Sequence, residues 1–421
     1  MNKKEIEKDV LRIAKKAKQA SLKVSLLSSK EKNEILEDAS NNIKKNKDLI
    51  IKKNSLDIKE HKNKLSPALL DRLMLNSDRI DGICNGLKEI AKLDDPIGKD
   101  LGKWKRPNGL EIQKVSIPLG VIGVIYESRP NVAADAAGLC LKSGNTLILR
   151  GGSESYHSSS KIVEIINMSI KKFGLPEGTL QNIPTTDRAA VGALLKMDKY
   201  VDVIIPRGGK SLIERVSEES RVHVIKHLDG ICHTYIHKSS DIEISKRVTI
   251  NAKMRRPGIC GATETILCDE EVVRTHLPEI IKCLGDQGCE IRGDKNIKTI
   301  HSSIVEANEE DWKTEYLDKI VSIKTISNGV EEAVNHINFY GSGHTDAIIS
   351  EDEKVTEFFL NNVDSGIVMQ NTSTQFADGG EFGMGAEIGI STSKVHARGP
   401  VGVAQLTSFK YKVRGKGQIR P

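Results

Sequence analysis

Cys260 has the sequence surroundings of a reactive thiol. It lies in the segment 251–265, Asn-Ala-Lys-Met-Arg-Arg-Pro-Gly-Ile-Cys-Gly-Ala-Thr-Glu-Thr, behind a Pro-Gly turn and a group of cations. The cations are Lys253, Arg255 and Arg256. A free thiol is only slightly ionised at neutral pH, and nearby positive charge and backbone N–H donors raise its thiolate fraction. The spacing alone leaves two interpretations open: a nucleophile, or a buried structural cysteine of the kind that we expect for Cys140 and Cys268.

Two loops have the composition of a phosphate- or ribose-binding site. Arg150 ends an apolar stretch and is followed by Gly151, Gly152 and Ser153. A cation at the carboxyl end of a strand, with glycines opening a helix, suits a phosphate or a ribose. The segment 206–211, Pro-Arg-Gly-Gly-Lys-Ser, repeats this pattern and imitates the end of a Walker A loop. The first glycine of that motif would fall at Ile204, so we reject a P-loop, while a phosphate at a helix N-terminus remains open.

A cluster of histidines with one cysteine resembles a metal site at first sight. Its members are His223, His227, Cys232, His233 and His237. The residues between them are strand-like, which would point many of these side chains apart, and no metal-ligand spacing accompanies them. We therefore expect no metal.

The first hundred residues predict a run of helices. Apolar residues recur at helical spacing within 6–17 and again within 35–43. Ser28 and Glu31 fit a capping box, and Ser66-Pro67 fits an N-cap followed by proline at the first helical position.

From about residue 115 onward, short apolar strands alternate with helices. We expect strands near 115–126, 146–150, 180 and 201–205, and helices near 131–142, 162–170, 187–196 and after 208. This alternation predicts parallel pairing in a doubly wound sheet, which binds ligands at the carboxyl ends of its strands. A second α/β stretch follows at about 229–362. The turn 107–109 (Pro-Asn-Gly) predicts a hairpin, and 405–413 predicts a last extended segment.

Composition limits the class of protein. A chain of 421 residues predicts two large lobes. The net charge of +6 comes from 63 basic and 57 acidic residues, and the 4% of aromatics do not interleave with the basic clusters, which argues against nucleic acid. The seven cysteines form no CxxC pair and predict reduced thiols. No signal peptide and no apolar run of ~20 residues is present, so we expect a cytoplasmic protein without membrane contact.

Several motifs together resemble one enzyme family. The setting of Cys260, with the segments 118–123 (Pro-Leu-Gly-Val-Ile-Gly) and 143–150 (Ser-Gly-Asn-Thr-Leu-Ile-Leu-Arg), resembles the aldehyde dehydrogenase superfamily. Three further segments are similar to its γ-glutamyl phosphate reductase family. These are 126–131 (Tyr-Glu-Ser-Arg-Pro-Asn), 340–346 (Tyr-Gly-Ser-Gly-His-Thr-Asp) and 385–402. The match runs from roughly residue 115 to the C-terminus, and the combination is specific although each piece alone is not.

This resemblance implies a mechanism. The Cys260 thiolate would attack the acyl carbon of γ-glutamyl phosphate and expel phosphate, and NADPH would reduce the resulting thioester to glutamate 5-semialdehyde, the second step of proline biosynthesis from glutamate. Arg129 stands where other aldehyde dehydrogenases have an oxyanion-hole asparagine, and His227 stands where they have a water-activating glutamate. The backbone N–H of Cys260 is the safest oxyanion donor. A reductase of an activated acid must not hydrolyse its thioester, so losing that carboxylate makes chemical sense.

The resemblance also implies site residues. Arg150 lies where relatives hold the adenine ribose with lysine, and an arginine there can accept a 2′-phosphate bidentately, which favours NADPH. The other expected cofactor-binding residues are Gly151, Ser153, Arg207, Gly208, Gly209, Lys210 and Glu387. The expected substrate-binding residues are Asn131, Lys253, Arg255, Arg256 and Arg398. The roles of these cations stay undivided between the phosphate and the α-carboxylate.

The resemblance divides the chain as well. Residues 1–228 form the expected cofactor-binding domain, to which 363–395 return, and 229–362 form the catalytic domain. A C-terminal β-arm, 396–421, would join 104–118 in a small β oligomerisation element. Its apolar side chains from Leu406 to Val413 need a partner edge, so we expect a homo-oligomer. We also consider a direct handover of γ-glutamyl phosphate from glutamate 5-kinase.

Three other functions were weighed against this one. The first is a CoA-acylating or simple aldehyde dehydrogenase. The second is an ATP-dependent amino-acid kinase, suggested by Gly-Gly-Lys-Ser at 208–211, against which the missing Walker glycine counts. The third is a nucleic-acid-binding protein, suggested by the basic balance and opposed by the scarcity of aromatics.

Overall fold

The computed structural model describes residues 2–226 and 229–420. The chain forms two compact units. The first consists of Met1–Lys226, Gly383–Gly389 and Val401–Pro421, and the second of His227–Phe382 and Ile390–Pro400. Part of the expected boundary is therefore wrong: of the segment 363–395, only 383–389 joins the first unit. No helix in the described part of the chain is long and apolar enough to cross a bilayer.

The N-terminal region of the first unit is helical, as the periodicity predicts. Its helices are α1 (Lys3–Val24), α2 (Ser29–Lys45), α3 (Lys47–His61), α4 (Pro67–Leu73) and α5 (Ser77–Lys92). The capping box before α2 is confirmed: the Ser28 side chain accepts from the backbone N–H of Glu31, and the Glu31 carboxylate accepts from that of Ser28. The cap before α4 is also confirmed, with the Ser66 hydroxyl accepting from the backbone of Leu69.

A parallel sheet with helices on both faces forms the centre of the first unit. Its strands run in the order β5 (Leu180–Asn182), β4 (Thr146–Gly151), β3 (Val121–Tyr126), β6 (Val203–Arg207) and β7 (His223–Val224). The helices after these strands are α6 (Val132–Lys142), α7 (Tyr156–Lys172), α8 (Ala189–Leu194) and α9 (Lys210–Glu219), with a 3-10 turn, η1, at Ser153–Ser155. The predicted doubly wound arrangement is confirmed, and the carboxyl ends of β3, β4 and β6 meet at one edge.

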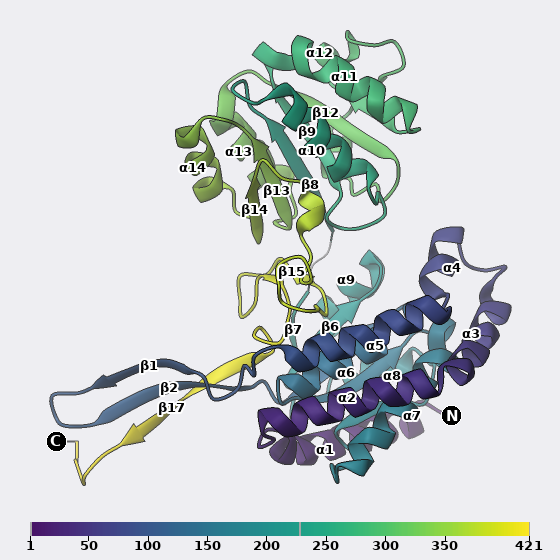
Figure 1. The fold of residues 1–421 in the computed structure, drawn as a ribbon, viewed down its shortest axis with the longest axis vertical. Helices are drawn as coiled ribbons and strands as arrows, with labels where there is room; N and C mark the ends of the chain where they lie inside the picture. Colours follow the sequence, from purple (N-terminus) through teal and green to yellow (C-terminus); the bar gives the residue numbers. More distant parts are fainter. Residues whose placement is uncertain (1, 227–228, 421) are drawn as a thin grey trace. The chain divides into compact units, whose positions relative to one another are not determined.

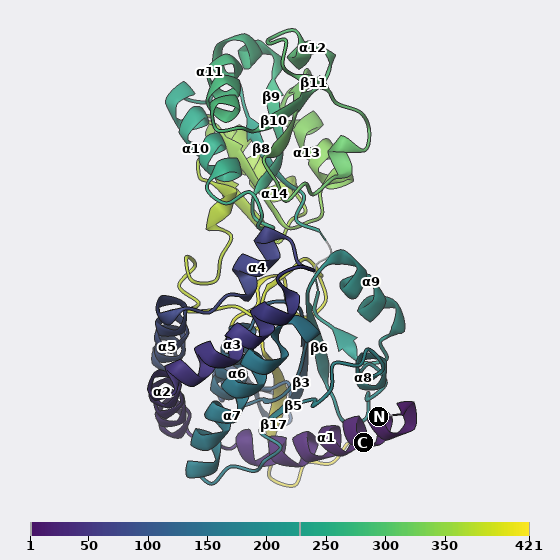
Figure 2. The same cartoon turned by 90° about the vertical axis from the view of Figure 1, so that its right-hand side faces the viewer.

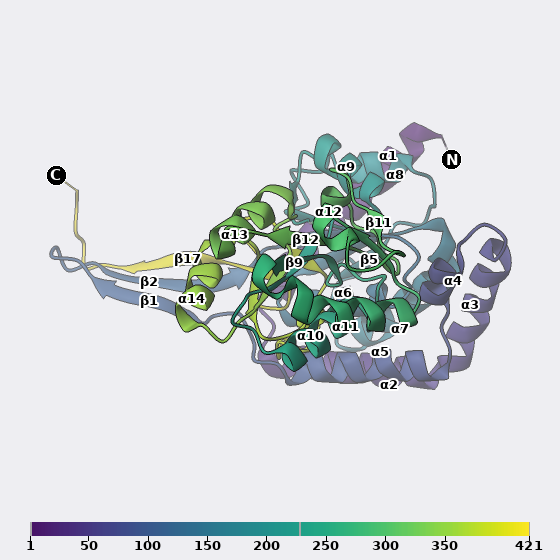
Figure 3. The same ribbon diagram turned by 90° about the horizontal axis from the view of Figure 1, so that it is seen from above.

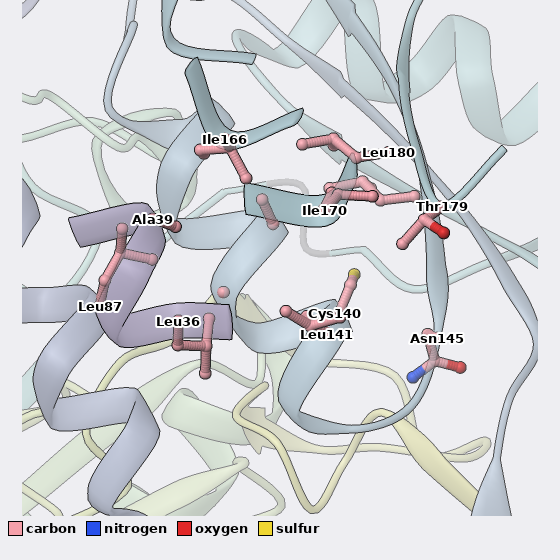
Figure 4. A pocket seen from close by; sticks show the side chains of 13 residues that line it. Leu36, Ala39, Leu87, Cys140, Leu141, Asn145, Ile166, Ile170, Thr179 and Leu180 are labelled. Carbon is pink, nitrogen blue, oxygen red and sulfur yellow. The ribbon is translucent and has the colours of Figure 1, made fainter. Parts of the chain in front are cut away.

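The two faces of this sheet have separate apolar cores. The core on one face joins α1 and α8 to the sheet, through residues such as Ile6, Val10 and Leu194. On the other face, α2, α5, α6 and α7 pack together, and Figure 2 shows them on the side opposite α8. Figure 4 shows a gap among these helices, lined mainly by apolar side chains, with a volume of about 10 Å³. A gap of that size has room for about one water, so it is an imperfection of the core.

A three-stranded antiparallel ribbon extends from the first unit (Figures 1 and 3). Its strands lie in the order β1 (Asp100–Lys105), β2 (Glu111–Pro118) and β17 (Thr407–Arg414). The predicted hairpin is confirmed, with Gly109 at a φ of +86° in its turn. One expected arm residue differs: Leu406 is fully buried, because its carbonyl oxygen accepts from the amide of Asn145 and the chain enters the body of the unit there.

The second unit is built around a parallel sheet. Its strands run in the order β11 (Val305–Glu306), β10 (Glu290–Gly293), β12 (Ile320–Ile326), β9 (Thr263–Asp269), β8 (Cys232–Ile236), β13 (Thr345–Ile349) and β14 (Ile367–Gln370). The remaining elements are α10 (Ile242–Met254), α11 (Val273–Asp286), α12 (Lys295–Lys298), α13 (Gly329–Tyr340), α14 (Glu353–Asn362), the 3-10 turns η2 (Glu270–Val272), η3 (Asp311–Lys313) and η4 (Thr374–Phe376), and the hairpin β15 (Ile390–Ser391) and β16 (Gly399–Pro400).

Separate cores cover the two faces of this second sheet. Helices α10 and α11 pack on one face, and α13 and α14 on the other. Figure 2 shows the two pairs on opposite sides of the strands. Strand β14 pairs in register with β13, from Ile367 opposite Thr345 onward. This pairing is the physical reason why residues 363–382 stay with the second unit rather than returning to the first.

A buried carboxylate connects the helical region to the start of α7 in the first unit. Asp57 of α3 accepts from the backbone N–H groups of His157 and Ser158 at 3.0 and 2.8 Å, and from the Ser158 hydroxyl at 2.5 Å. These donors begin α7, so Asp57 caps that helix across about a hundred residues of sequence. Burial raises the pKa of Asp57, and the donors around the carboxylate oppose that rise.

We predict that Asp57→Ala lowers the free energy of unfolding by about 1–3 kcal/mol, because it leaves buried donors at the start of α7 without an acceptor. Asp57→Asn keeps an acceptor and should cost less. Urea unfolding measures both variants. The matched control is Glu37→Ala on the exposed face of α2, which should leave stability near its wild-type value. Equal losses for the Asp57→Ala and Glu37→Ala variants would contradict the capping role.

Candidate active site

Cys260 is half-buried in the turn between α10 and β9, and close backbone contacts fix it there. A Cβ built on Gly230 would lie 2.6 Å from the Cα and 2.7 Å from the Cβ of Cys260, so only glycine fits at position 230. The thiol of Cys232 donates to the carbonyl oxygen of Cys260 at 3.1 Å. Burial raises the pKa of Cys232 well above its usual value, so this thiol stays protonated and remains a donor.

Of the three predicted cations before Cys260, Lys253 has a structural position. Its side chain is fully buried, and its ammonium lies 2.5 Å from Oε2 of Glu264, which is also fully buried. Burial raises the pKa of Glu264 to about 7, and the charge of Lys253 opposes that rise. A lysine enclosed in this way is not available to a ligand. The geometry therefore argues against the expected direct contact between Lys253 and substrate, and the pair instead connects α10 to β9 on either side of Cys260.

Arg255 and Arg256 are exposed, and Gln375 of η4 organises the backbone that carries them. The Gln375 amide donates to the carbonyl oxygens of Ala252 at 2.9 Å and Arg256 at 3.3 Å. Its oxygen accepts a long hydrogen bond of 3.4 Å from Arg255. The same turn reaches the nucleophile, because a Cβ on Gly261 would lie 3.1 Å from the carbonyl oxygen of Thr374.

Arg398 lies next to β16 of the second unit and is held by one acid. Its guanidinium donates to a carboxylate oxygen of Asp364 at 2.8 Å and to the backbone oxygen of the same residue at 2.7 Å. The ammonium of Lys394 is 2.5 Å from the other carboxylate oxygen. The hydrogen bonds from Lys394 and Arg398 lower the pKa of Asp364. Arg398 is therefore oriented by Asp364 while part of its side chain stays exposed.

In the first unit, the side chain of Arg150 is buried and already hydrogen-bonded. Its side chain ends β4 at 7% exposure, and its guanidinium donates to the carbonyl oxygens of Thr186 at 2.7 Å and Gly151 at 3.1 Å. This burial lowers its pKa, while the carboxylates of Glu154 and Glu127 oppose the effect. Arg188, an exposed cation just before α8, lowers the pKa further. Bidentate binding of a phosphate by Arg150 would require it to release both carbonyls. Arg188 is a nearby cation that the sequence analysis did not single out.

The predicted phosphate site at the start of α9 already contains a carboxylate. Oε2 of Glu127 accepts from the backbone N–H of Gly209 at 2.9 Å, and Gly208 lies directly against the same group. Lys210 is exposed at the first position of the helix. An anion at this helix N-terminus would have to displace Glu127, just as one at α7 would have to displace Asp57. The expectation that Gly208 and Gly209 bind a phosphate there is therefore not supported.

The loop between β3 and α6 holds the remaining predicted residues of the first unit. Arg129 is half-buried there and follows Ser128, whose φ of +46° is unusual for a residue other than glycine. The amide of Asn131 donates to Asp135 at 2.8 Å. Burial raises the pKa of Asp135 to about 6, against the effects of Asn131 and of Arg207.

Arg207 itself marks the place where the segment 383–389 joins the first unit. A Cβ on Gly389 would lie 2.8 Å from a guanidinium nitrogen of Arg207, so the two pack closely. Glu387, two residues earlier, is half-buried in this segment. The structure thus brings Glu387 into the same unit as the predicted cofactor-binding residues.

The edge at the end of β4 fits the ribose of a dinucleotide better than its pyrophosphate. Ser153 is exposed there. The buried Oε2 of Glu154 and Nε of Arg150 have no hydrogen-bond partner among the described residues. A ribose hydroxyl can donate to such a carboxylate oxygen and accept from such a nitrogen. The two neighbouring helix N-termini, by contrast, already have acids as partners.

The histidine cluster separates in the structure. His233 is buried and bound to Asp346 at 2.8 Å, His237 is paired with Asp269 at 3.6 Å, and His223 is exposed. Cys232 contacts Cys260 instead. Within residues 2–226 and 229–420, no group of three or more potential ligands is placed to hold a metal ion. His227 lies outside the described residues.

Comparisons with known proteins agree with this architecture. The sequence profile of the aldehyde dehydrogenase family matches residues 3–319. A γ-glutamyl phosphate reductase of Paramagnetospirillum magneticum is 54% identical over 410 residues, which cover 97% of each chain. The crystal structure of a γ-glutamyl phosphate reductase from Thermotoga maritima superposes with a TM-score of 0.95 at 39% identity, covering 98% of this chain and 100% of that one. An acetylating aldehyde dehydrogenase from Geobacillus thermoglucosidasius shares the fold, with a TM-score of 0.71 at 18% identity, over 100% and 99% of the two chains.

We predict a pH-dependent contribution of Asp135 to stability. Its pKa is raised in the folded state, from an ordinary 3.8 to about 6, so the folded protein keeps a proton that the unfolded chain releases. This contribution is present below about pH 4 and is lost as the pH rises to about 6, by on the order of 3 kcal/mol. Urea unfolding of wild type and Asp135→Asn between pH 4 and 8 measures it. A stability difference that does not change with pH over this window would contradict the assignment.

Proposed function

The chain belongs to the aldehyde dehydrogenase family and, within it, to the γ-glutamyl phosphate reductases, and we propose that it reduces γ-glutamyl phosphate to glutamate 5-semialdehyde through a thioester on Cys260. The observation that carries the proposal is the structural environment of Cys260. The residue is half-buried rather than enclosed, and its backbone is fixed by Gly230 and Cys232. A nucleophile needs both an accessible sulfur and a fixed position to reach its acyl carbon.

In the proposed reaction, the Cys260 thiolate attacks the acyl carbon, a carbon–sulfur bond forms, and phosphate leaves with the bonding electron pair. When bound, the nicotinamide cofactor supplies the hydride that reduces this thioester. The Cys260 sulfur then carries a thiohemiacetal oxyanion. Its carbon–oxygen double bond re-forms as the carbon–sulfur bond breaks, so the aldehyde is released and the thiolate returns. The backbone N–H of Cys260 stabilises the oxyanion in both tetrahedral states, and Arg129 is a proposed second donor.

The thioester must survive until it is reduced, and the carboxylate closest in sequence to Cys260 is not free to activate water. Glu264 is bound by Lys253 and accepts from the backbone N–H of Leu317 at 3.3 Å. A carboxylate engaged in this way is a poor general base for an attacking water. This arrangement favours transfer of the acyl group to phosphate in the reverse direction over hydrolysis.

We propose NADPH as the cofactor, with Arg150, Gly151, Ser153, Arg207, Lys210 and Glu387 as its binding residues. Arg188 lies close to Arg150 at the end of β4, and we propose these two cations as the partners of a 2′-phosphate, with Glu154 as the partner of a ribose hydroxyl. For the substrate, Asn131, Arg255, Arg256 and Arg398 remain the proposed contacts, and Lys253 acts only through Glu264. We further propose a cytoplasmic enzyme of proline biosynthesis, consistent with the reduced state of every described cysteine, and a handover of substrate from glutamate 5-kinase.

The sharpest test of the thioester uses the reverse reaction. Wild-type enzyme given glutamate 5-semialdehyde and NADP⁺ without phosphate should form a burst of about one NADPH per Cys260 and then stop. Addition of phosphate should start steady turnover, because it removes the acyl group. Cys260→Ser or Cys260→Ala should lose both phases and keep NADPH binding, which fluorescence titration measures.

Cys283→Ala is the matched control, since that thiol lies on α11 and is also half-exposed. Its burst and turnover should equal those of wild type. Steady turnover without phosphate would indicate simple aldehyde oxidation, and a requirement for coenzyme A in place of phosphate would indicate a CoA-acylating enzyme. ATP turnover without any change in NADPH would favour the kinase. Each of these outcomes would overturn the proposal.

We also propose that the ribbon of β1, β2 and β17 is a homo-oligomerisation element. Its outer strands have free edges among the described residues, and β17 exposes apolar side chains. Phe409, Tyr411 and Val413 are 45%, 55% and 56% exposed, which is a large apolar surface for an edge strand. A second copy of the same ribbon would cover both the strand edge and this surface.

The double variant Tyr411→Lys/Val413→Lys should therefore lower the molar mass in solution, because charges would replace the apolar contact. Light scattering on a sizing column measures the mass. The control is Phe339→Lys, an aromatic of the second unit that is 73% exposed, which should leave the mass unchanged. A wild-type monomer, or an unchanged mass for the double variant, would contradict this role.

A further inference from the structure

A cavity on the second unit is bordered by two arginines and one glutamate. It has a volume of about 370 Å³ and lies between α10 and the segment 371–381. Arg247 and Asn251 of α10 border it together with Arg255, the C-cap residue of the helix. Their positions i, i+4 and i+8 place them on one side of the helix. Ser373 and Phe376 form part of the opposite wall, and Glu381 lies at its border.

The two arginines have no carboxylate partner among the described residues. Neighbouring lysines do have one: Lys246 pairs with Glu279 at 2.9 Å, and Lys253 with Glu264. Arg255 makes only its long hydrogen bond to Gln375, and Arg247 is exposed. Two guanidinium groups that border one cavity repel each other, so a bound carboxylate lowers their energy. A planar carboxylate is the group that arginine binds best.

The cavity and the nucleophile share a wall. The turn η4 contributes Gln375 and Phe376 to the cavity. Between Ser373 and Gln375 is Thr374, whose carbonyl oxygen lies against Gly261, the residue after Cys260. The hydroxyl of Thr374 is also 3.1 Å from that of Thr263. One short turn therefore lies between the cavity and the backbone next to Cys260.

We propose that this cavity binds the amino-acid end of the γ-glutamyl substrate, an assignment that rests on the proposed function. Arg247 and Arg255 bind the α-carboxylate, with the amide of Asn251 as a further donor, and Glu381 binds the α-ammonium. The acyl carbon then points toward Cys260. Arg255 is thereby assigned to the α-carboxylate. The phosphate of the substrate is then bound by other cations, for which Arg256 and Arg398 are the candidates.

Opposite charges at the two walls distinguish this cavity from a general anion site. A phosphate or a dicarboxylate would meet the carboxylate of Glu381 as well as the arginines, and the repulsion between like charges disfavours its binding. A zwitterionic α-amino acid satisfies both walls. The cavity thus gives a physical reason for selecting a glutamyl group over a simple acyl group.

Three aldehydes test the carboxylate contact and the ammonium contact independently. Glutamate 5-semialdehyde carries both the carboxylate and the ammonium, 5-oxopentanoate carries the carboxylate alone, and pentanal carries neither. Arg247→Gln should lower kcat/KM about 10- to 100-fold for the first two and leave pentanal unchanged. Glu381→Gln should lower kcat/KM for glutamate 5-semialdehyde alone. NADPH formation in the presence of phosphate measures each value, and circular dichroism checks the fold of each variant.

Lys246→Gln is the matched control. It removes one positive charge from the residue next to Arg247, outside the cavity, and should leave all three values unchanged. As a direct measure of binding, L-glutamate should protect Cys260→Ala against thermal unfolding, and Arg247→Gln in that background should remove the protection.

The outcomes distinguish the two proposals. If wild-type enzyme oxidises glutamate 5-semialdehyde well and Arg247→Gln does the same, the cavity assignment is wrong and the proposed function stands. Equal losses on all three aldehydes also overturn the assignment, because they would indicate damage to the nucleophile or the fold. If wild-type enzyme prefers pentanal, the proposed function itself fails.

Discussion

The close approach of Gly230 to Cys260 is the constraint on which the chemistry of the second unit depends. No side chain fits at position 230, so the start of β8 lies directly against the backbone of the nucleophile. In the same region the thiol of Cys232 donates to the carbonyl oxygen of Cys260, and Cys260 is half-buried. The motif 340–346 supports the same region, because the Ser342 hydroxyl accepts from the backbone of Ile231 and Asp346 binds His233. Residues that touch no substrate therefore decide where the sulfur lies.

Much of the fold follows from short-range sequence patterns. The capping box at Ser28 and Glu31, the hairpin turn at Gly109 and the strand–helix alternation after residue 115 each depend on neighbours within a few positions, and the structure confirms them. The return of residues 363–395 was misplaced because strand pairing is a long-range choice. An apolar strand such as β14 fits either sheet by pattern alone, and its register with β13 decides the matter.

The candidate site was predictable in part for the same reason. The sequence shows that cations lie close to Cys260 along the chain. It does not show which acidic residue pairs with each cation in the fold. Glu264 takes Lys253 out of reach of substrate, and Asp364 orients Arg398 from 34 residues away. Glu127 and Asp57 were missed because they act on glycines and helix ends far along the sequence. A glycine-rich helix start predicts an anion, and only the fold shows that the anion is the protein's own carboxylate.

Whether a cation has an acidic partner therefore indicates its role better than its position in the sequence does. A cation with a buried acid beside it, such as Lys253, is held in place, and its removal would leave an unpaired carboxylate in the interior. An exposed arginine whose only hydrogen bond goes to an amide, such as Arg255, keeps its charge available for a group outside the chain. A bound carboxylate pairs with such a charge through hydrogen bonds that the free protein does not make. The arginines without acidic partners are thus where ligand binding energy is available, whereas the paired lysines determine the shape of the site.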